Sequence, residues 1–243
     1  MSNTPPAAIP NDYDTNPDRF RTNVLAVEKY GLANDVHEEV AQRFSVESQS
    51  PVLDVGCGEG RLTKHLQALG IPTVAFDFSP TMLSAITLTN AASARVQGDA
   101  CHLPFADNTF GAAAALYMLY HLPDPSQAIA ECRRVLRTGG LFAACAPSRY
   151  NDPELRPYLP ISDVIHMAET FDAENGPDFV ADIFGDIEVE RWDAPLVHLP
   201  DDVALRHYLQ GRQLSVDVID AIVAQVPLPL NLTKRGALIY ARK

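Results

Sequence analysis

The sequence is short of basic side chains and of long apolar runs. It holds 19 Lys and Arg against 31 Asp and Glu among 243 residues, a formal net charge of −12 at pH 7. Such a field repels nucleic-acid phosphates and anionic lipid surfaces. No uncharged stretch is apolar enough to cross a bilayer, and residues 1–14 have neither the basic nor the apolar region of a secretory signal. We therefore expect a soluble cytoplasmic protein that binds neither nucleic acid nor membrane.

Cysteines are few and far apart. The four, Cys57, Cys101, Cys132 and Cys145, form no CxxC pair and have no His at metal-ligand spacing. This pattern argues against a disulfide framework and a zinc site, so we expect structural cysteines in a reducing compartment. No repeat of 20 to 50 residues is visible. With 47% hydrophobic and 21% charged positions, the composition and length fit one α/β domain.

Residues 1–18 are polar and proline-rich, so we expect a flexible lead-in before a single domain over 19–243. Apolar residues between Val24 and Phe44 recur at spacings near three and four, which predicts helix on either side of a break near Gly31.

From residue 50 to 147, strand-length apolar runs alternate with helix-compatible stretches, which is typical of a parallel sheet. After this core we expect a helical lid insertion over about 148–200 and C-terminal helices and strands over about 186–243. The fold class is α/β, with a doubly wound, mostly parallel, seven-stranded sheet. The predicted strands are 52–55, 73–76, 94–97, 110–116, 140–146, 187–192 and 237–240, and the predicted helices are 60–69, 80–90, 125–137, 201–211 and 215–225.

A glycine-rich turn follows the first predicted strand. Gly56, Gly58 and Gly60 alternate with other residues, and a helix begins directly after them. Alternate glycines let the backbone approach a ligand closely, and the helix N-terminus offers unpaired N–H groups. Asp77 and Asp99 follow the next two strands, so all three features meet at the carboxyl edge of one sheet, where doubly wound folds bind ligands. Taken singly, each carboxylate could also be a helix cap or a solvated turn residue.

The glycine spacing distinguishes two cofactor classes. A dinucleotide fold needs G-x-G-x-x-G, whereas the residue three after Gly58 is Arg61, and Asp54 precedes the first glycine by two positions. The sequence instead resembles the class I S-adenosylmethionine-dependent methyltransferases, particularly the small-molecule branch with the ubiquinone and menaquinone C-methyltransferases. The resemblance covers about residues 50–147 and is carried by the segments 53–60, 76–83, 98–100, 103–105, 120–124 and 131–140.

The resemblance implies S-adenosyl-L-methionine as cofactor. The glycine loop would contact its methionine part, Asp77 would hold the ribose diol, and Phe78 and Met82 would flank the adenine. Asp99 would accept the adenine amino group. The residues implied in cofactor binding are Asp54, Gly56, Cys57, Gly58, Asp77, Phe78, Met82, Gly98, Asp99, Ala100 and Tyr117.

A sulfonium methyl is already electrophilic, so catalysis requires mainly alignment and water exclusion. If the acceptor must lose a proton, His121 after the fourth strand is the candidate base, although it could equally bond backbone or cap a turn. No carboxylate precedes Asp124 in this region, as metal-assisted catechol methyltransferases would place one, so we predict no metal. The Pro-Pro tetrad of nucleic-acid amino methyltransferases is also missing.

The sequence thus predicts methyl transfer to a small organic acceptor by in-line displacement. We expect residues 13–30 and the insertion after Ser148 to close over the site and set specificity. A protein or peptide side-chain methyltransferase, or a non-catalytic S-adenosylmethionine-binding protein, remains open as an alternative. Neither the accepting atom nor the oligomeric state can be inferred from the sequence.

Overall fold

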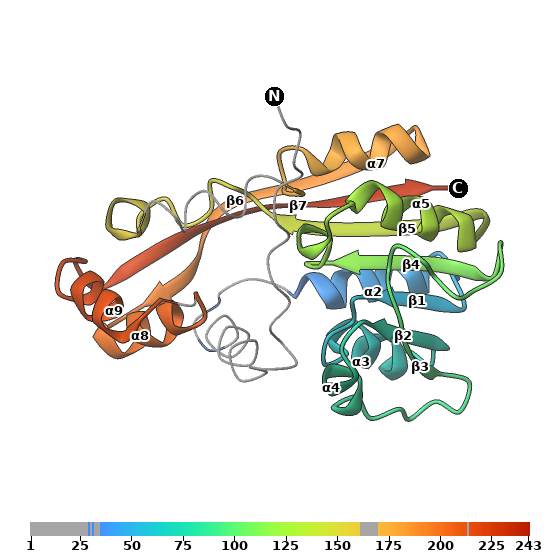
Figure 1. Cartoon of the computed structure of the whole chain (residues 1–243), viewed down its shortest axis with the longest axis horizontal. Coiled ribbons are helices and arrows are strands. Elements are labelled where there is room, and N and C mark those ends of the chain that lie inside the picture. The colour runs from blue at the N-terminus through green and yellow to red at the C-terminus, as the bar shows by residue number, and fades with distance from the viewer. Residues whose placement is uncertain (1–28, 30, 32–34, 161–169, 213) are drawn as a thin grey trace.

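The computed structural model describes residues 29, 31, 35–160, 170–212 and 214–243, drawn in colour in Figure 1. Its centre is a seven-stranded sheet of order β3-β2-β1-β4-β5-β7-β6. Strands β1 to β5 are parallel to one another, while β7 runs antiparallel to β5 and to β6. The strands are β1 Val52–Val55, β2 Thr73–Asp77, β3 Ala94–Gln97, β4 Phe110–Leu116, β5 Leu136–Pro147, β6 Ile187–Leu199 and β7 Leu230–Arg242.

Helices cover both faces of this sheet (Figure 1). The buried residues of α2 and α3 pack on one face against β1, β4, β5 and β7. On the other face, α5 and α7 pack against the same central strands. The predicted α/β class and the doubly wound, seven-stranded sheet are confirmed. The helices are α2 Val36–Val46, α3 Arg61–Ala68, α4 Pro80–Ser84, α5 Pro125–Val135, α7 Gly176–Phe184, α8 Asp202–Gln210 and α9 Val216–Val223, with short 3-10 turns η1 Leu119–His121 and η2 Arg156–Tyr158.

Two helix starts follow the expected capping chemistry. Ser79 accepts the N–H of Met82 at 3.2 Å before Pro80, and Asp124 accepts the N–H of Gln127 at 3.0 Å. Proline suits the next position because its missing N–H would have no helical partner.

Two predicted helices are shorter than expected. Helix α4 stops at Ser84 instead of residue 90, where the chain carries several β-branched residues and the Gln67 side chain takes the Thr89 N–H and hydroxyl. Helix α5 stops at Val135 instead of 137, because Leu136 is extended and pairs with Phe110 in the sheet.

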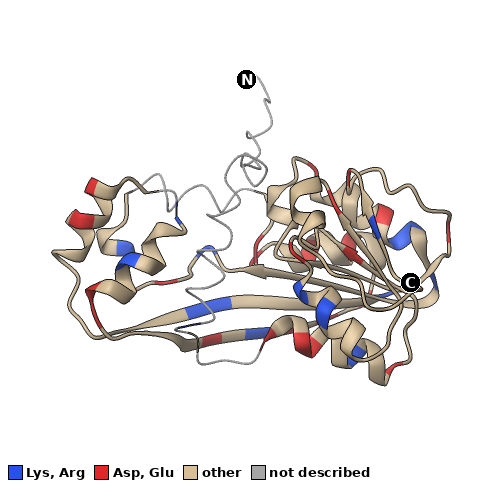
Figure 2. Ribbon diagram, turned by 90° about the horizontal axis from the view of Figure 1, so that it is seen from below, with Lys and Arg blue, Asp and Glu red and all other residues tan. Residues whose placement is uncertain are grey.

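The last two strands are each more than twice as long as predicted. Strands β6 and β7 have 13 residues each and form a ribbon that runs past the carboxyl edge of the parallel strands. Helices α8 and α9 connect them and form a hydrophobic cluster of their own with residues such as Leu155, Leu205 and Ile222. Figure 2 shows this second lobe at one end of the ribbon and the main sheet at the other. The second lobe therefore lies on the side of the main sheet where the parallel strands have their carboxyl ends.

The four cysteines are free and buried. Within the described ranges, no helix is long and apolar enough to cross a membrane. The predicted flexible segment 1–18 lies outside the described residues, as does the predicted helix before Gly31.

Candidate functional site

A tight turn at the end of β1 forms the centre of the candidate site. Gly56, Gly58 and Gly60 have φ values of +65°, +54° and +80°, in the left-handed region that favours glycine. The N–H groups of Gly56 and Cys57 donate to the Phe76 carbonyl at 2.8 and 3.1 Å. A Cβ on Gly56 would stand 2.7 Å from the Met118 side chain, so this position has no room for one. Both the backbone conformation and the close approach of Met118 therefore require glycine at position 56.

Asp77 lies beside this turn, at the end of β2. One carboxylate oxygen accepts the Gly58 N–H at 2.8 Å and the other accepts the Ser79 N–H at 2.8 Å. The residue is 9% exposed. These bonds fix both oxygens at the carboxyl edge. A carboxylate accepts hydrogen bonds from hydroxyl donors as well as from N–H groups. A ribose diol offers two such donors, so the position suits the predicted role.

Phe78 and Met82 flank Asp77 in different ways. Phe78 exposes 62% of its surface, which is unusual for a large apolar side chain next to a buried acid. Met82, in the first turn of α4, is only 2% exposed. An exposed aromatic ring beside a carboxylate could form one wall for a planar base, while Met82 lies in the packing underneath.

Asp99 follows β3 in the next turn along the same edge. Its carboxylate accepts the Cys101 N–H at 2.9 Å and contacts His102 Nδ1 at 3.1 Å, and these hydrogen bonds lower the pKa of Asp99. The side chain remains 51% exposed. Gly98 is required beside it, because a Cβ there would stand 2.7 Å from the Phe76 ring. The adjacent Ala100 is 7% exposed, and the site thus offers an ionised acceptor in open surroundings.

Asp54 differs from the other two acids because it lies inside the fold. It is 3% exposed and accepts the Thr63 N–H at 3.1 Å and the Thr63 hydroxyl at 2.7 Å. Burial raises the pKa of Asp54 to about 7. These contacts join β1 to the first turn of α3 and hold the glycine turn from below. Burial also raises the pKa of Cys57, so its thiol stays protonated.

Two residues expected near the methyl follow β4. Tyr117 has φ +56°, an unusual value for a residue with a side chain, and its N–H donates to the Cys145 carbonyl at 2.9 Å. Burial is the main cause that raises the pKa of the Tyr117 hydroxyl. His121 ends the short turn η1, and its ring centroid lies 4.5 Å from that of Tyr120. Both predicted residues therefore lie near the carboxyl end of β4.

Sequence reasoning missed a group of charged residues at the same edge. Asp35 caps α2 and contacts His37 Nδ1 at 2.9 Å, Arg61 Nε at 3.0 Å and His65 Nε2 at 3.2 Å. His37 belongs to no sequence motif. However, an Asp that directly precedes a helical pattern and lies two residues before a His is a signal that could have indicated the contact between Asp35 and His37.

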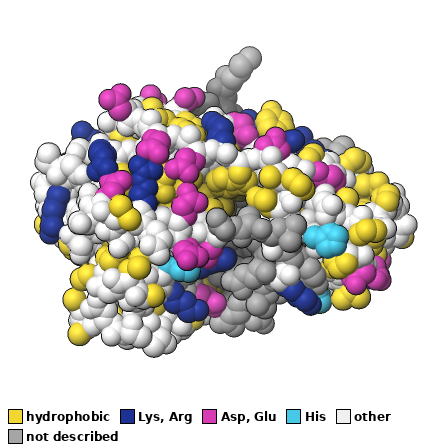
Figure 3. All heavy atoms as spheres, turned by 180° about the vertical axis from the view of Figure 1, so that it is seen from behind, with side chains coloured by type: hydrophobic (Ala, Val, Ile, Leu, Met, Phe, Trp, Pro, Cys, Tyr) yellow, Lys and Arg dark blue, Asp and Glu magenta, His cyan; other side chains and the backbone are white. Residues whose placement is uncertain are grey.

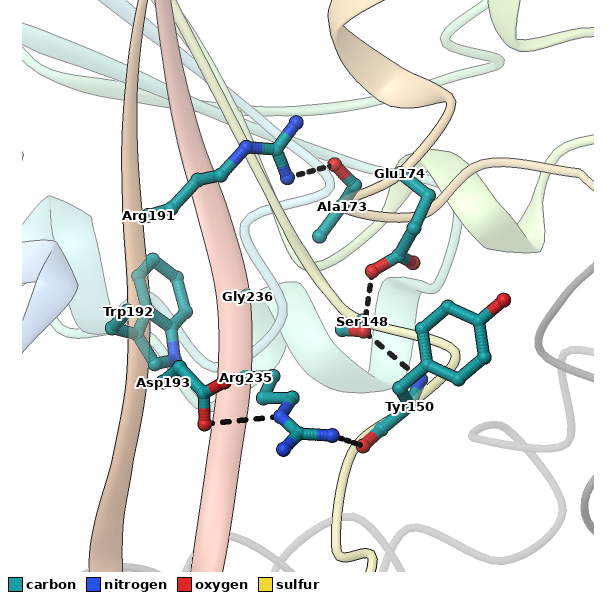
Figure 4. Close-up of a pocket in the computed structure, with 9 residues that line it drawn as sticks. All are labelled: Ser148, Tyr150, Ala173, Glu174, Arg191, Trp192, Asp193, Arg235 and Gly236. Atoms are coloured by element: carbon teal, nitrogen blue, oxygen red, sulfur yellow. Dashed lines mark hydrogen bonds and ion pairs between the residues drawn. The ribbon is translucent and has the colours of Figure 1, made fainter.

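A separate hollow of about 360 Å³ lies where β5 ends on the ribbon (Figure 4). Its polar groups bind one another: Arg235 contacts Asp193 at 3.0 Å, the Ser148 hydroxyl contacts Glu174 at 2.5 Å, and Arg191 donates to the Ala173 carbonyl at 2.6 Å. Because these polar groups are partners of one another, we interpret the hollow as part of the junction between the ribbon and the loops that precede and follow it. Among the described residues, no cluster of His, Cys, Asp and Glu could hold a metal ion.

Comparison with known proteins defines the class. A family model described as Methyltransferase domain matches residues 53–144, the part that holds the glycine turn and both carboxyl-edge acids. The demethylmenaquinone methyltransferase of Lactiplantibacillus plantarum is 35% identical over 131 residues, 49% of this chain and 54% of that protein. That of Corynebacterium kroppenstedtii is 31% identical over 147 residues, 57% of this chain and 60% of that protein. The chain thus spans little more than half the length of these curated relatives.

Solved structures extend the likeness of fold to most of the chain. A putative methyltransferase from Bacillus halodurans has a TM-score of 0.63 at 15% identity and covers 85% of this chain and 98% of its own. The [4+2]-cyclase SpnF has a TM-score of 0.61 at 17% identity, covering 95% of this chain and 94% of that chain.

These findings show what this chain is similar to: it resembles the class I S-adenosylmethionine-dependent methyltransferases, including the quinone C-methyltransferases, as the sequence predicted. The roles of the individual site residues stay predictions.

Proposed function

We propose that this protein transfers the methyl group of S-adenosyl-L-methionine to a small organic acceptor by in-line displacement. The observation that carries the proposal is the convergence of the glycine turn, Asp77 and Asp99 at one sheet edge, with the exposed Phe78 directly after Asp77. Each part suits one part of the cofactor: a turn of small residues for the methionine, a fixed carboxylate for the ribose diol, and an ionised acceptor for the adenine amine.

The bound cofactor supplies a reactive methyl on a sulfonium centre. The chain must then fix the acceptor in line with the S–C bond and exclude water, which lowers the barrier through proximity and orientation. The lobe formed by α8 and α9 stands opposite the carboxyl edge, at the far end of the β6–β7 ribbon. We propose that the acceptor reaches the cofactor at the turn after β4, on the side of the sheet where this lobe stands.

A small acceptor is favoured over nucleic acid by charge and by likeness. The formal net charge is −12, which disfavours binding to phosphate backbones. On the face shown in Figure 3, acidic side chains are interspersed with basic ones. The named relatives are demethylmenaquinone methyltransferases, which makes a hydroxylated aromatic or quinol ring the first acceptor to assay. The matching region ends at residue 144, before the ribbon and its lobe, so the acceptor itself is free to differ.

Replacement of Asp77 tests cofactor binding. We expect Asp77→Ala to weaken binding of S-adenosylhomocysteine at least about 10-fold, because it removes charge-assisted hydrogen bonds to the ribose. Titration calorimetry measures the affinity. The control is Asp182→Ala on α7, an exposed acid away from the carboxyl edge, which should bind like the wild type. Equal affinities for wild type and Asp77→Ala would contradict the assignment.

The alternatives predict different outcomes of a transfer assay with labelled S-adenosylmethionine. Labelling of peptides but not of small aromatic acceptors would favour a protein methyltransferase. Binding without transfer to either would favour a role other than methyl transfer. The fold is not restricted to that reaction, since the similar SpnF structure is named a [4+2]-cyclase.

A further inference from the structure

The N-terminus of α2 lies at the same sheet edge as the glycine turn. Helix α2 ends at Val46 and β1 begins at Val52, so the chain reverses at the opposite edge and α2 runs back beside β1. Eleven residues of helix extend about 16 Å, enough to span a short strand. The ion pair of Asp35 with Arg61, the residue after Gly60, anchors this end of α2 beside the turn.

The second residue of α2, His37, is held by Asp35 in one orientation. Asp35 Oδ1 accepts the His37 backbone N–H at 3.0 Å and lies 2.9 Å from ring Nδ1. A carboxylate partner makes Nδ1 the protonated nitrogen, which leaves the lone pair on Nε2. Nε2 hydrogen-bonds to no residue in the described ranges, and the side chain is 16% exposed. This is the arrangement of a carboxylate-oriented imidazole base.

The opposite side of His37 faces the exit of β4. The ring centroids of His37 and Tyr117 are 5.9 Å apart, with the planes tilted by 36°. Tyr117 is the first residue after β4, where the acceptor must approach the sulfonium in the proposed reaction. His37 thus lies between the start of α3 and the end of β4, on elements that meet at the cofactor turn.

We propose that His37 is the general base of this enzyme, oriented by Asp35. The inference rests on the proposed methyl transfer. As the acceptor attacks, its bond to the methyl carbon forms and the S–C bond breaks, with the electron pair remaining on sulfur as neutral S-adenosylhomocysteine. The proton from the acceptor oxygen, nitrogen or acidic carbon passes to His37 Nε2 and later to water, so no further reactant is needed.

Burial, together with two basic residues of α3, keeps His37 neutral. Burial is the largest effect and lowers the pKa of His37, Asp35 opposes it, and Arg61 and His65 on α3 lower it further. Tyr117, after β4, stays protonated. A neutral imidazole at neutral pH can accept a proton, as a base must.

Nitrogen NMR of ¹⁵N-histidine-labelled protein tests the position without an acceptor. S-Adenosylmethionine and S-adenosylhomocysteine differ by one positive charge at sulfur, so a nearby imidazole should titrate about half a pH unit or more lower in the former complex. We expect this difference and the Nδ1–H tautomer at His37. Equal titration of His37 in both complexes would overturn the proposal. Absence of binding by calorimetry would instead reject the proposed function.

Kinetics with matched variants test the role itself. The assay uses a naphthoquinol and a catechol as probes. We expect His37→Gln to lower kcat about 100-fold or more while S-adenosylhomocysteine affinity stays within about twofold, and to remove the acidic limb of the pH profile. Lys64→Gln, which changes an exposed side chain of α3 outside this group, should keep kcat. If His121→Gln abolishes turnover while His37→Gln does not, the base is His121 and the proposal fails.

Discussion

At the scale of single residues, the space around a positive-φ glycine differs between the β1 turn and the end of α3. Gly56 faces Met118 at 2.7 Å and Gly60 faces Ile86 at 3.0 Å from the place a Cβ would take. Gly70, after α3, also has a positive φ of +73°, but nothing lies within 4 Å of its Cβ position. Gly56 therefore combines a conformational requirement with a steric one, whereas Gly70 has the first alone.

This contrast gives a prediction for Gly56→Ala. The variant should lose more unfolding free energy than Gly70→Ala, by about 1 to 3 kcal/mol for the added overlap with Met118. Gly70→Ala should cost about 1 to 2 kcal/mol from its φ alone. Denaturant unfolding measures both. In calorimetry only Gly56→Ala should weaken S-adenosylhomocysteine binding, and equal weakening by both would show that backbone strain in general is responsible.

At the scale of elements, Arg134 links α5 to the segment that follows Asp99 through hydrogen bonds and ion pairs. Arg134 donates to the carbonyls of Leu103 and Phe105 at 2.9 and 2.8 Å and pairs with Glu131 and Asp107 at 2.7 and 2.8 Å. The segment from 99 to 109 contains no helix or strand, so these bonds replace regular structure in fixing its course.

We expect Arg134→Met to lower the unfolding free energy by about 1 to 3 kcal/mol, because the two carbonyls lose their donor. Arg133→Met, one residue earlier and exposed, should change it by no more than about 0.5 kcal/mol. Urea unfolding of the two variants is the measurement, and indistinguishable midpoints would contradict this account of the segment.

At the scale of the whole molecule, a buried carboxylate joins the two lobes. Asp152 is fully buried in the loop after β5, and it binds Tyr208 of α8 at 2.7 Å and Lys234 of β7 at 2.9 Å, with Arg212 as a further partner. Burial raises the pKa of Asp152, but the two cations outweigh it and the net pKa is lowered. The junction thus holds the α8–α9 lobe on its ribbon through charge.

Asp152→Asn should destabilise the protein by about 3 kcal/mol at pH 7, since buried cations lose their carboxylate. A lowered pKa means that Asp152 stabilises the fold above the ordinary aspartate pKa and loses this effect as pH falls through its folded-state pKa. The difference between wild type and variant should therefore shrink on acidification. Asp193→Asn, in an exposed pair with Arg235, serves as control and should cost less than about 1 kcal/mol. A difference independent of pH would contradict the role of charge.

The sequence by itself determined the parallel core, because periodic apolar runs, caps such as Ser79 and Asp124, and glycines at turns act over a few residues. It also placed Asp77 and Asp99 at strand ends. Only the tertiary structure decided the lengths of β6 and β7, since an edge ribbon is defined by its partner's register and not by local preference. The contact of His37 with Tyr117 likewise joins residues 80 positions apart, and no local pattern specifies such a distance.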